Sequence, residues 1–518
     1  MKLLHELILF TANRDPASPA LRHRLKDITY AELAAQVSSV SGGLLECGVQ
    51  RGDRVAIYLP KQPEAVIAYF ATSMAGAVFV PINSQLKAAQ VEHILDDCAA
   101  KILITTADRA QSLRAMCAKH NGLQTVVLDG DEDSSSLAGS LRWEELLAAS
   151  ANQRRSDESD LAALFYTSGS TGKPKGVMLS HCNLVTGAES VSQYLQNDAG
   201  DRLLTVLPFS FDYGFSQLST AFLVGACVVL FEYLLPRDVV RAVKNERITG
   251  LACVPTVWLQ LSRQQWPVDI TNHLRYITNS GGSLPQTALG ALRKKLPKTD
   301  VYLMYGLTEA FRSTYLDPTE IDRRPTSIGK AVPNAKVMIV HADGSPCGAN
   351  EPGELVHSGP FVALGYWNDP ENTAKRFRPA PGASTTEIAV WSGDTVRADE
   401  EGFLYFVGRS DDMIKTSGYR VSPTEIEEVL YDSGLVSVAA AVGIPHHELG
   451  QAIVVAAVSP SGSGDSKGVL DYCRSQMPNY MIPAHVDWRT QLPRTVNDKI
   501  DRQLLASELK DFFAGTTA

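Results

Sequence analysis

The segment YTSGSTGKPKGV, residues 166–177, combines the residue types that bind a polyphosphate. Its glycines let the backbone approach an anion closely, its hydroxyl and amide groups supply hydrogen-bond donors, and Lys173 and Lys175 add positive charge. A Walker A loop is excluded, because Pro174 follows the glycine–lysine pair where that motif needs Ser or Thr. A flexible Gly/Ser loop is the alternative interpretation, but the two lysines and the density of donors favour phosphate chemistry.

The elements that must position this segment alternate between short apolar strands and helices. RVAIYLP (54–60) predicts a strand, and PEAVIAYFATSMAG (63–76) predicts a helix, because its apolar residues recur at helical spacing. Strands separated by helices are typical of an α/β fold with largely parallel sheets. Further buried strands are expected at 77–83, 101–106, 125–129, 202–208, 226–231 and 251–255.

Length and composition predict a globular protein of two or more domains. A chain of 518 residues is too long to fold around one hydrophobic core. Its content of 44% hydrophobic and 20% charged residues is an ordinary globular composition. After about residue 360, turns alternate with short strands, which predicts a small α+β region. The net charge of −9 and the lack of a long basic run argue against nucleic acid or an anionic membrane as a partner.

The cysteines and the N-terminal residues favour a reducing compartment. No pair among the eight cysteines has the CxxC spacing of a zinc or redox site. The apolar run Leu7–Phe10 is too short for a signal peptide, and no stretch approaches the length of a membrane span. We therefore expect a cytoplasmic protein without a membrane span.

Six segments in order resemble those of one enzyme family. Besides the glycine-rich segment, they are YGLTE (305–309), GELVHSGPFVALGYWN (353–368), SGD (392–394), GRSDDMIKTSGYRVSPTEIE (408–427) and LPRTVNDKIDR (492–502). Together they resemble the AMP-forming adenylating ligases, namely acyl-CoA synthetases, peptide-synthetase adenylation domains and luciferases. Among stand-alone members, the chain looks most like exosortase-associated acyl-CoA ligases and prolyl-AMP ligases.

The resemblance implies an enzyme that uses ATP and Mg²⁺ to convert a small carboxylic acid into an acyl-AMP, with release of pyrophosphate. The acyl group would then pass to a phosphopantetheine thiol, on coenzyme A or on a carrier protein. Loading of an amino acid such as proline onto a carrier protein stays open as an alternative. An adenylating oxidase, as luciferases are, and a non-catalytic binder of nucleotide or acyl groups are less favoured.

The resemblance also implies two domains with different mobility. An N-terminal AMP-binding domain (1–408) would contain mixed, mostly parallel sheets flanked by helices. A small mobile α+β lid domain (413–518) would follow a hinge at 409–412 that contains Asp411. The same lid would serve both half-reactions by rotating about this hinge.

Three lid residues are assigned by resemblance. Lys499 would bridge the incoming carboxylate and the α-phosphate, because a lysine is a compact charge on a long stem. After rotation, Lys415 and Gly418 would line the tunnel for the thiol. The family usually has glycine before the catalytic lysine, whereas this chain has Asp498, whose charge would weaken the field at Lys499.

The nucleotide site follows from the same resemblance. Thr308 would bond the α-phosphate, and Glu309 would hold Mg²⁺ through a carboxylate oxygen. Tyr305 would stack on adenine, and Asp394 would accept hydrogen bonds from the ribose with Arg409 nearby. The remaining residues are Thr167, Ser168, Gly169, Ser170, Thr171, Gly172 and Lys175 around the phosphates, and Gly281, Gly282 and Gly306 near the adenine.

The acid pocket is expected between LPFSFDYGFSQL (207–218), SGGSLP (280–285) and the residues after YGLTE. The Phe-Asp pair ending at Asp212 resembles amino-acid-activating members, in which an aspartate binds the substrate ammonium. The following Tyr-Gly resembles acyl-CoA synthetases, so an amino acid and another acyl acid both stay open. Asp212 could instead only cap the next helix. The expected pocket residues are Phe211, Asp212, Tyr213, Ser280, Ala310, Phe311 and Arg312.

Overall fold

The computed structural model describes residues 1–86, 88–113, 123–128, 140–168, 174–382, 387–409, 413–416, 419–446, 449–477, 479–495 and 498–513. It confirms the α/β prediction. Two large sheets flanked by helices form most of the structure, and two smaller sheets follow them in the chain.

The first large sheet has nine strands in the order β16-β15-β14-β13-β12-β10-β11-β1-β2. Parallel pairing joins the strands from β14 to β1, and antiparallel pairing adds β2 at one edge and β15 and β16 at the other. The strands are β1 (Pro19–His23), β2 (Lys26–Thr29), β10 (Arg202–Thr205), β11 (Cys227–Leu230), β12 (Gly250–Cys253), β13 (Tyr276–Asn279), β14 (Asp300–Tyr305), β15 (Thr314–Leu316) and β16 (Lys330–Ala331).

The second large sheet has eight strands in the order β19-β9-β8-β4-β3-β5-β6-β7. Its central strands are parallel, whereas β8 and β9 form an antiparallel hairpin in which Thr167 pairs with Lys175. The strands are β3 (Arg54–Tyr58), β4 (Val78–Pro81), β5 (Ile102–Thr106), β6 (Gln124–Leu128), β7 (Leu141–Arg142), β8 (Leu161–Ser168), β9 (Pro174–Ser180) and β19 (Gly365–Tyr366).

The two smaller sheets have five strands each. The third sheet is antiparallel and comprises β17 (Lys336–Val340), β18 (Gly353–Ser358), β20 (Phe377–Pro379), β21 (Ile388–Ala398) and β22 (Leu404–Arg409). The fourth comprises β23 (Ile414–Thr416), β24 (Tyr419–Val421), β25 (Val438–His446), β26 (Gly450–Val458) and β27 (His485–Trp488).

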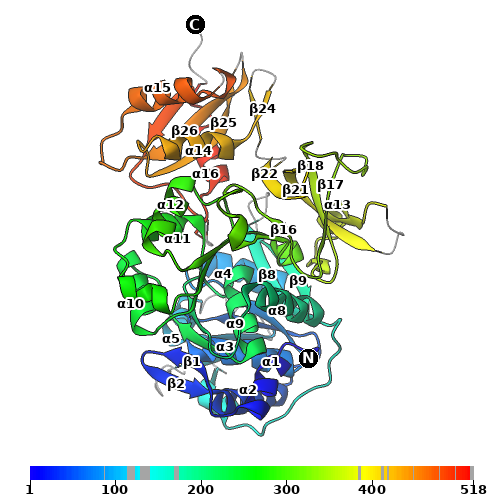
Figure 1. The fold of residues 1–518 in the computed structure, drawn as a ribbon. Coiled ribbons are helices and arrows are strands. Elements are labelled where there is room, and N and C mark those ends of the chain that lie inside the picture. The colour runs from blue at the N-terminus through cyan, green and yellow to red at the C-terminus, as the bar shows by residue number, and fades with distance from the viewer. Residues whose placement is uncertain are drawn as a thin grey trace.

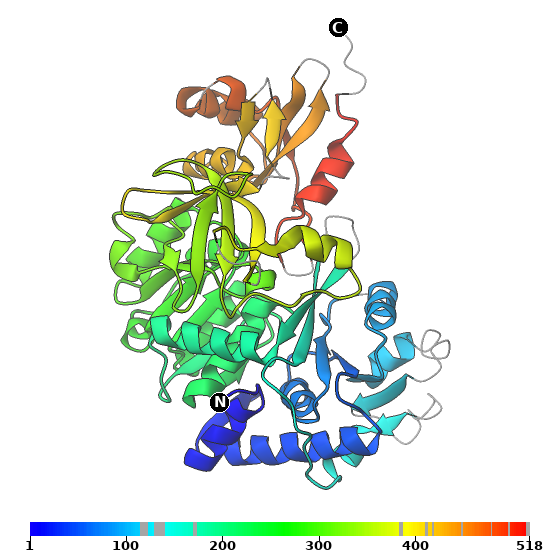
Figure 2. The same ribbon diagram turned by 90° about the vertical axis from the view of Figure 1, so that its right-hand side faces the viewer.

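The α-helices cover the sheets, as Figures 1 and 2 show from two directions. They are α1 (Glu6–Arg14), α2 (Tyr30–Glu46), α3 (Pro63–Met74), α4 (Ala88–Asp97), α5 (Ala107–Ser112), α7 (Trp143–Leu147), α8 (His181–Leu195), α9 (Asp212–Val224), α10 (Pro236–Asn245), α11 (Pro255–Ser262), α12 (Gln286–Lys295), α13 (Pro370–Arg376), α14 (Pro423–Asp432), α15 (Ser466–Gln476) and α16 (Arg502–Leu509). Short 3-10 turns include η3 (Thr308–Ala310). Within the described residues, no helix has the length and apolar character to cross a membrane.

Helix α9 lies in the main hydrophobic core, which fixes where it begins. Every residue from Asp212 to Phe222 is buried. The ring centroid of Phe215 lies 5.1 Å from that of Phe79 on β4 and 5.6 Å from that of Phe165 on β8. Because aromatic side chains bury the largest apolar areas, these contacts hold the start of α9 firmly against the second sheet.

The C-terminal part has a hydrophobic core of its own. Ile414, Ile426 and Val455 belong to one cluster of buried residues from β23, α14 and β26. In Figure 1 the labelled elements α14 and β26, in shades of orange, lie above α11 and α12, and α14 contacts α12. The predicted α+β character of this region is confirmed.

Gly214 tests how tightly the start of α9 is held. A Cβ at this position would lie 2.0 Å from the carbonyl oxygen of Pro208. We expect Gly214→Ala to lower the free energy of unfolding by about 1–3 kcal/mol, because the helix must shift to relieve the overlap. Chemical unfolding measures the change.

Gly290→Ala in α12 is the matched control, since a Cβ there would meet nothing within 4 Å. Alanine is the better helix former, so this variant should be as stable as the parent chain or up to about 1 kcal/mol more stable. Equal stability of the Gly214 and Gly290 variants would contradict the tight packing of α9.

Candidate active site

Loops that follow neighbouring parallel strands bring the predicted segments together. Asp212 follows β10, Thr256 follows β12, and residues 280–282 follow β13. The YGLTE segment (305–309) begins at the last residue of β14. Loops at the carboxyl ends of parallel strands form the usual ligand crevice of an α/β sheet, so these segments share the edge of the sheet where the candidate crevice lies.

Lys499 reaches this crevice from the C-terminal part of the chain. Its side chain lies against Gly281, where a Cβ would stand 3.1 Å from Lys499 Cε. Its Nζ lies 5.2 Å from the centroid of the Phe211 ring. Gly281 has a φ of 81°, so both its backbone conformation and the approaching lysine require glycine. The last segment of the family resemblance and the predicted acid pocket therefore meet.

Asp498 occupies a position that favours glycine. Its φ is 60°, a left-handed conformation that aspartate tolerates better than most residues. Its Oδ1 lies 3.0 Å from Arg494 Nη1, and its Oδ2 lies 3.1 Å from Thr256 Oγ1, which donates the hydrogen bond. Arg494 thus lies within ion-pair distance of Asp498, which offsets part of the negative charge beside Lys499.

Asp212 is a buried carboxylate in contact with Thr308. Thr308 Oγ1 donates a hydrogen bond to Asp212 Oδ1 at 2.9 Å. Burial raises the pKa of Asp212 above its usual value, while the charges of Arg312 and Lys499 and the Thr308 hydrogen bond oppose the increase. The helix-capping interpretation is wrong, because Phe211 occupies the N-cap position and the Asp212 side chain bonds Thr308 instead.

The other predicted pocket residues are also buried. Ser280, Ala310 and Phe311 are buried, and the Tyr213 hydroxyl shares a hydrogen bond with Thr278 on β13. Phe311 has a φ of 54°, and the next residue's N–H donates to the Ala310 carbonyl at 2.6 Å, which forms a tight three-residue turn. Such a conformation is uncommon for a bulky residue and concentrates at functional sites.

Tyr305 and Asp394, the predicted adenine and ribose residues, contact each other. The Tyr305 hydroxyl donates to Asp394 Oδ2, and the tyrosine ring packs against Phe406. Gly306 follows β14, and Gly282 follows Gly281 at the end of β13. Asp394 on β21 pairs with Arg409 on β22 in the sheet, which places the two predicted ribose residues on neighbouring strands.

Glu309 lies beside the glycine-rich hairpin. Its Oε1 accepts a hydrogen bond from the Tyr366 hydroxyl at 2.6 Å. Lys175 Nζ lies 5.5 Å from the Tyr366 ring centroid and 3.5 Å from Asp369 Oδ2. A half-buried carboxylate next to a predicted phosphate site suits Mg²⁺, which prefers carboxylate and phosphate oxygens. The residues present therefore fit a magnesium ion.

Part of the predicted site lies outside the described residues. These positions are Gly169, Ser170, Thr171, Gly172, Asp411 and Gly418. Thr167 and Ser168 end β8, and Lys415 pairs with Arg420 between β23 and β24. The side chains of Ser168, Arg409 and Lys415 are likewise outside the description.

Three contributors to the site were missed by sequence reasoning. Thr256 belongs to no recognised segment, so no signal identified it. Tyr366 and Arg494 lie inside the family-like segments 353–368 and 492–502, which is a usable signal, but the resemblance assigns neither of them a role.

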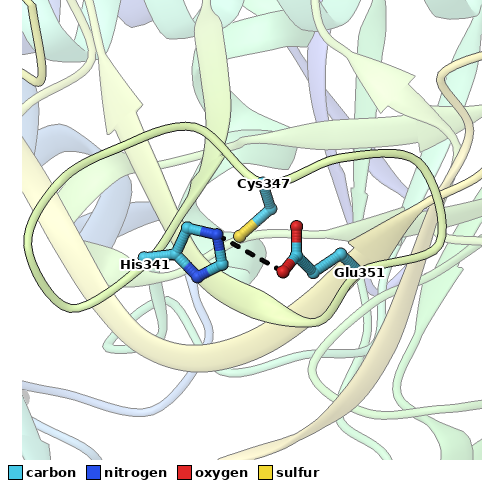
Figure 3. A group of neighbouring side chains, drawn as sticks. All are labelled: His341, Cys347 and Glu351. Carbon is cyan, nitrogen blue, oxygen red and sulfur yellow. Dashed lines mark ion pairs between the residues drawn. The ribbon is translucent and has the colours of Figure 1, made fainter.

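A separate group of metal-ligand residue types lies on the loop between β17 and β18. Figure 3 shows His341, Cys347 and Glu351 turned toward one another, with potential ligand atoms within 4.8 Å. His341 Nε2 lies 3.4 Å from Glu351 Oε1. Cysteine spacing gave no indication of this group. It comes from one partly exposed loop of the third sheet, and we assign it no role in the crevice.

Comparisons with known proteins match most of the chain. The family described as AMP-binding enzyme matches residues 10–367, and its C-terminal domain matches residues 425–499. Tyrocidine synthase 2 from Brevibacillus parabrevis is 30% identical over 97% of this chain, which spans only 13% of that protein. Feruloyl-CoA synthase from Amycolatopsis sp. is 31% identical over 94% of this chain and 95% of its own length.

A solved structure supports the same relationship. It is o-succinylbenzoate coenzyme A synthetase from Bacillus subtilis, in complex with ATP and magnesium ion, with 26% identity and a TM-score of 0.81 over 96% of this chain and 98% of that one. The family match covers more than half of the chain, and its C-terminal match includes Lys499. The chain therefore belongs to the AMP-binding enzyme family of adenylate-forming ligases.

Proposed function

We propose that this chain adenylates a carboxylic acid with ATP, releases pyrophosphate, and transfers the acyl group to a phosphopantetheine thiol of coenzyme A or of a carrier protein. The observation that carries the proposal is the position of Lys499. Its side chain lies against Gly281 and above Phe211, and its charge acts on Asp212, which is hydrogen-bonded to Thr308. A cation from the C-terminal part thus lies where a carboxylate and a phosphate would meet.

The chemistry needs this cation, because the attacking carboxylate and the α-phosphate are both anions. Lys499 would hold the two oxygens together and offset the negative charge that builds during attack. Two unit charges 4 Å apart interact by about 4 kcal/mol at an effective dielectric constant of 20, which is a rate factor of ~10³. Mg²⁺ on Glu309 would neutralise the departing pyrophosphate.

The proposed nucleotide site is formed by residues at the end of β14 and on β21. Tyr305, Gly306 and the SGG backbone would surround adenine, and Asp394 with Arg409 would bind the ribose. The Tyr305–Asp394 hydrogen bond supports this assignment, since it joins the two groups into one wall. The phosphates would lie on the β8–β9 hairpin, where Thr167 pairs with Lys175.

We also propose the domain division at 1–408, 409–412 and 413–518. In its support, β22 belongs to the third sheet and ends at Arg409, whereas β23 begins the separate C-terminal sheet at Ile414. Rotation about this connection would withdraw Lys499 and bring Lys415 and Gly418 toward the acyl-AMP for thiol transfer.

For the acid, the surroundings of Asp212 favour a substrate without an α-ammonium group. An aspartate that binds ammonium should present an uncompensated carboxylate. Asp212 already accepts from Thr308 and lies under the positive charges of Arg312 and Lys499. Amino-acid adenylation remains the second candidate, because Asp212 is the buried carboxylate of the expected pocket.

ATP–pyrophosphate exchange with matched acids tests the function and the second candidate together. Propanoate is compared with alanine, and 3-phenylpropanoate with phenylalanine. We expect exchange to favour the acids without ammonium. Net turnover should release AMP and not ADP. Product masses with coenzyme A and with a holo carrier protein then identify the acceptor. Exchange that is selective for amino acids and lost in Asp212→Ala would establish the second candidate instead.

Asp498 should support the adenylation arrangement, contrary to the expectation from sequence. Asp498→Gly keeps the left-handed backbone and the hydrogen bonds that the carbonyl oxygen accepts from Thr256 and Arg494, but it removes the side-chain contacts to both residues. We expect adenylation to fall about 3- to 10-fold, since hydrogen bonds of this kind contribute about 0.5–1.5 kcal/mol each. Thioester formation from a preformed acyl-AMP should not change.

Thr256→Val provides the matching second variant. If both substitutions break the same contact, their combined effect on adenylation should be smaller than the sum of the single effects. Faster adenylation in Asp498→Gly than in the parent chain would mean that Asp498 does weaken the field at Lys499.

A further inference from the structure

Arg312 is a buried arginine at the candidate active site without a full set of partners. Its side chain is 2% exposed, and its Nε has no hydrogen-bond partner in the described structure. Among the described residues, no carboxylate oxygen lies within 4.0 Å of its guanidinium nitrogens, the limit for an ion pair. Burying a charge without pairing is costly, so such a residue requires an explanation.

The guanidinium group is held in place by aromatic rings. Its Cζ lies 4.7 Å from the Tyr213 ring centroid and 5.7 Å from the Phe311 ring centroid. These contacts attract the cation and orient its plane, but they leave the N–H donors in that plane available. Arg312 is therefore held mainly by contacts with aromatic rings.

The backbone before Arg312 adopts the uncommon turn at Phe311 that directs the chain back into the crevice. Phe311 itself is anchored, because its ring fills the space beside Gly187 on α8, where a Cβ would come within 2.5 Å. Helices α8 and α9 lie side by side (Figure 1), and Arg312 contacts a residue of α9. The uncommon turn at Phe311 and the buried cation of Arg312 are thus adjacent in the expected pocket.

Two neighbouring groups, Tyr194 and Asp212, satisfy the Arg312 guanidinium only in part. The Tyr194 hydroxyl donates its hydrogen to Met304 Sδ at 3.1 Å, and its oxygen can accept from the guanidinium. Burial raises the pKa of Tyr194 to about 12, so this partner is neutral and does not offset the charge of Arg312. Asp212 lies in the field of Arg312 and offsets part of its charge, but it accepts its hydrogen bond from Thr308 and forms no ion pair with the guanidinium among the described contacts. Gly306 allows the chain around Arg312 to approach closely, since a Cβ there would lie 3.0 Å from the Phe311 carbonyl oxygen and 3.5 Å from Arg312 Nη1.

We propose that Arg312 determines specificity by binding a second carboxylate, at the end of the acid remote from the reacting carboxyl group. The reacting carboxylate lies at Lys499, and Arg312 receives the other end across Asp212 and Tyr213. A guanidinium binds a carboxylate through two parallel N–H donors. Neither Tyr194 nor Asp212 makes this two-pronged contact with Arg312. This inference rests on the proposed function and narrows its substrate to dicarboxylic acids.

Matched acids test the inference by ATP–pyrophosphate exchange. Hexanoate is compared with hexanedioate, and octanoate with octanedioate, so that each pair differs only at the remote end. The monoamide of hexanedioate separates charge from hydrogen bonding. We expect the parent chain to prefer the diacid of at least one pair by about 10-fold or more in kcat/KM, with the monoamide between the two.

Arg312→Met should lower kcat/KM for the diacid about 10- to 100-fold, mainly through a higher KM. The same variant should change kcat/KM for the methyl-ended acid less than about 3-fold. Arg312→Lys should restore part of the diacid activity, because it restores the charge without the two-pronged geometry. Arg378→Met is the control, since Arg378 stacks on Trp391 at 3.6 Å in the third sheet. It should leave the preference unchanged.

The outcomes separate this inference from the proposed function. Equal losses for both acids in Arg312→Met would mean that the arginine is structural, and a parent chain that prefers methyl-ended acids would overturn the inference even if the variant does not fold. Either result leaves adenylation itself intact. Failure of every acid to give AMP and pyrophosphate would instead contradict the proposed function.

Discussion

The arrangement of the site depends on one electrostatic requirement, which is that a cation must stand between two anions that repel each other. Lys499 meets this requirement only if the C-terminal part lies on the crevice at the carboxyl ends of β10, β12, β13 and β14. The contact of Lys499 with Gly281 depends on the absence of a Cβ at that glycine. The hydroxyl of Thr256 holds the turn that carries the lysine. The contacts that pack the C-terminal part against the crevice are thus the same contacts that place the charge of Lys499.

The remaining charges are arranged around this cation. Glu309 and Lys175 lie on the side of the glycine-rich hairpin, where phosphates and a magnesium ion are proposed to bind. Asp212 and Arg312 lie on the side of the acid, where each is buried and neither pairs directly with the other. Because buried charges interact strongly, this pocket should discriminate acids by their polar groups more than by their length.

The sequence predicted the architecture well, because local patterns determine it. The strands at 54–60, 101–106 and 226–231 and the helix at 63–76 appear as β3, β5, β11 and α3, with ends shifted by a few residues. The order of the six segments also predicted that distant loops would meet. Both signals come from residue type and spacing, which are present in the chain before it folds.

Contacts between segments could not be predicted in the same way. Nothing in the local sequence links Thr308 to Asp212, which are 96 positions apart, or Asp498 to Thr256, which are 242 positions apart. Sequence alone makes Asp498 unfavourable beside a lysine, because its partners Arg494 and Thr256 come together only in the fold. The burial of Arg312 depends on the uncommon turn at Phe311, which sequence does not encode as a recognisable motif.

The most direct test of this account separates the two half-reactions in Lys499→Ala. Adenylation is followed by pyrophosphate exchange, and thiol transfer by thioester formation from a preformed acyl-AMP. The account predicts a loss of about 10²- to 10³-fold in adenylation, in line with the interaction of a single charge at close range, and less than about 3-fold in transfer. Equal losses in both half-reactions, or no loss in adenylation, would contradict the role of Lys499 as the cation between the two anions.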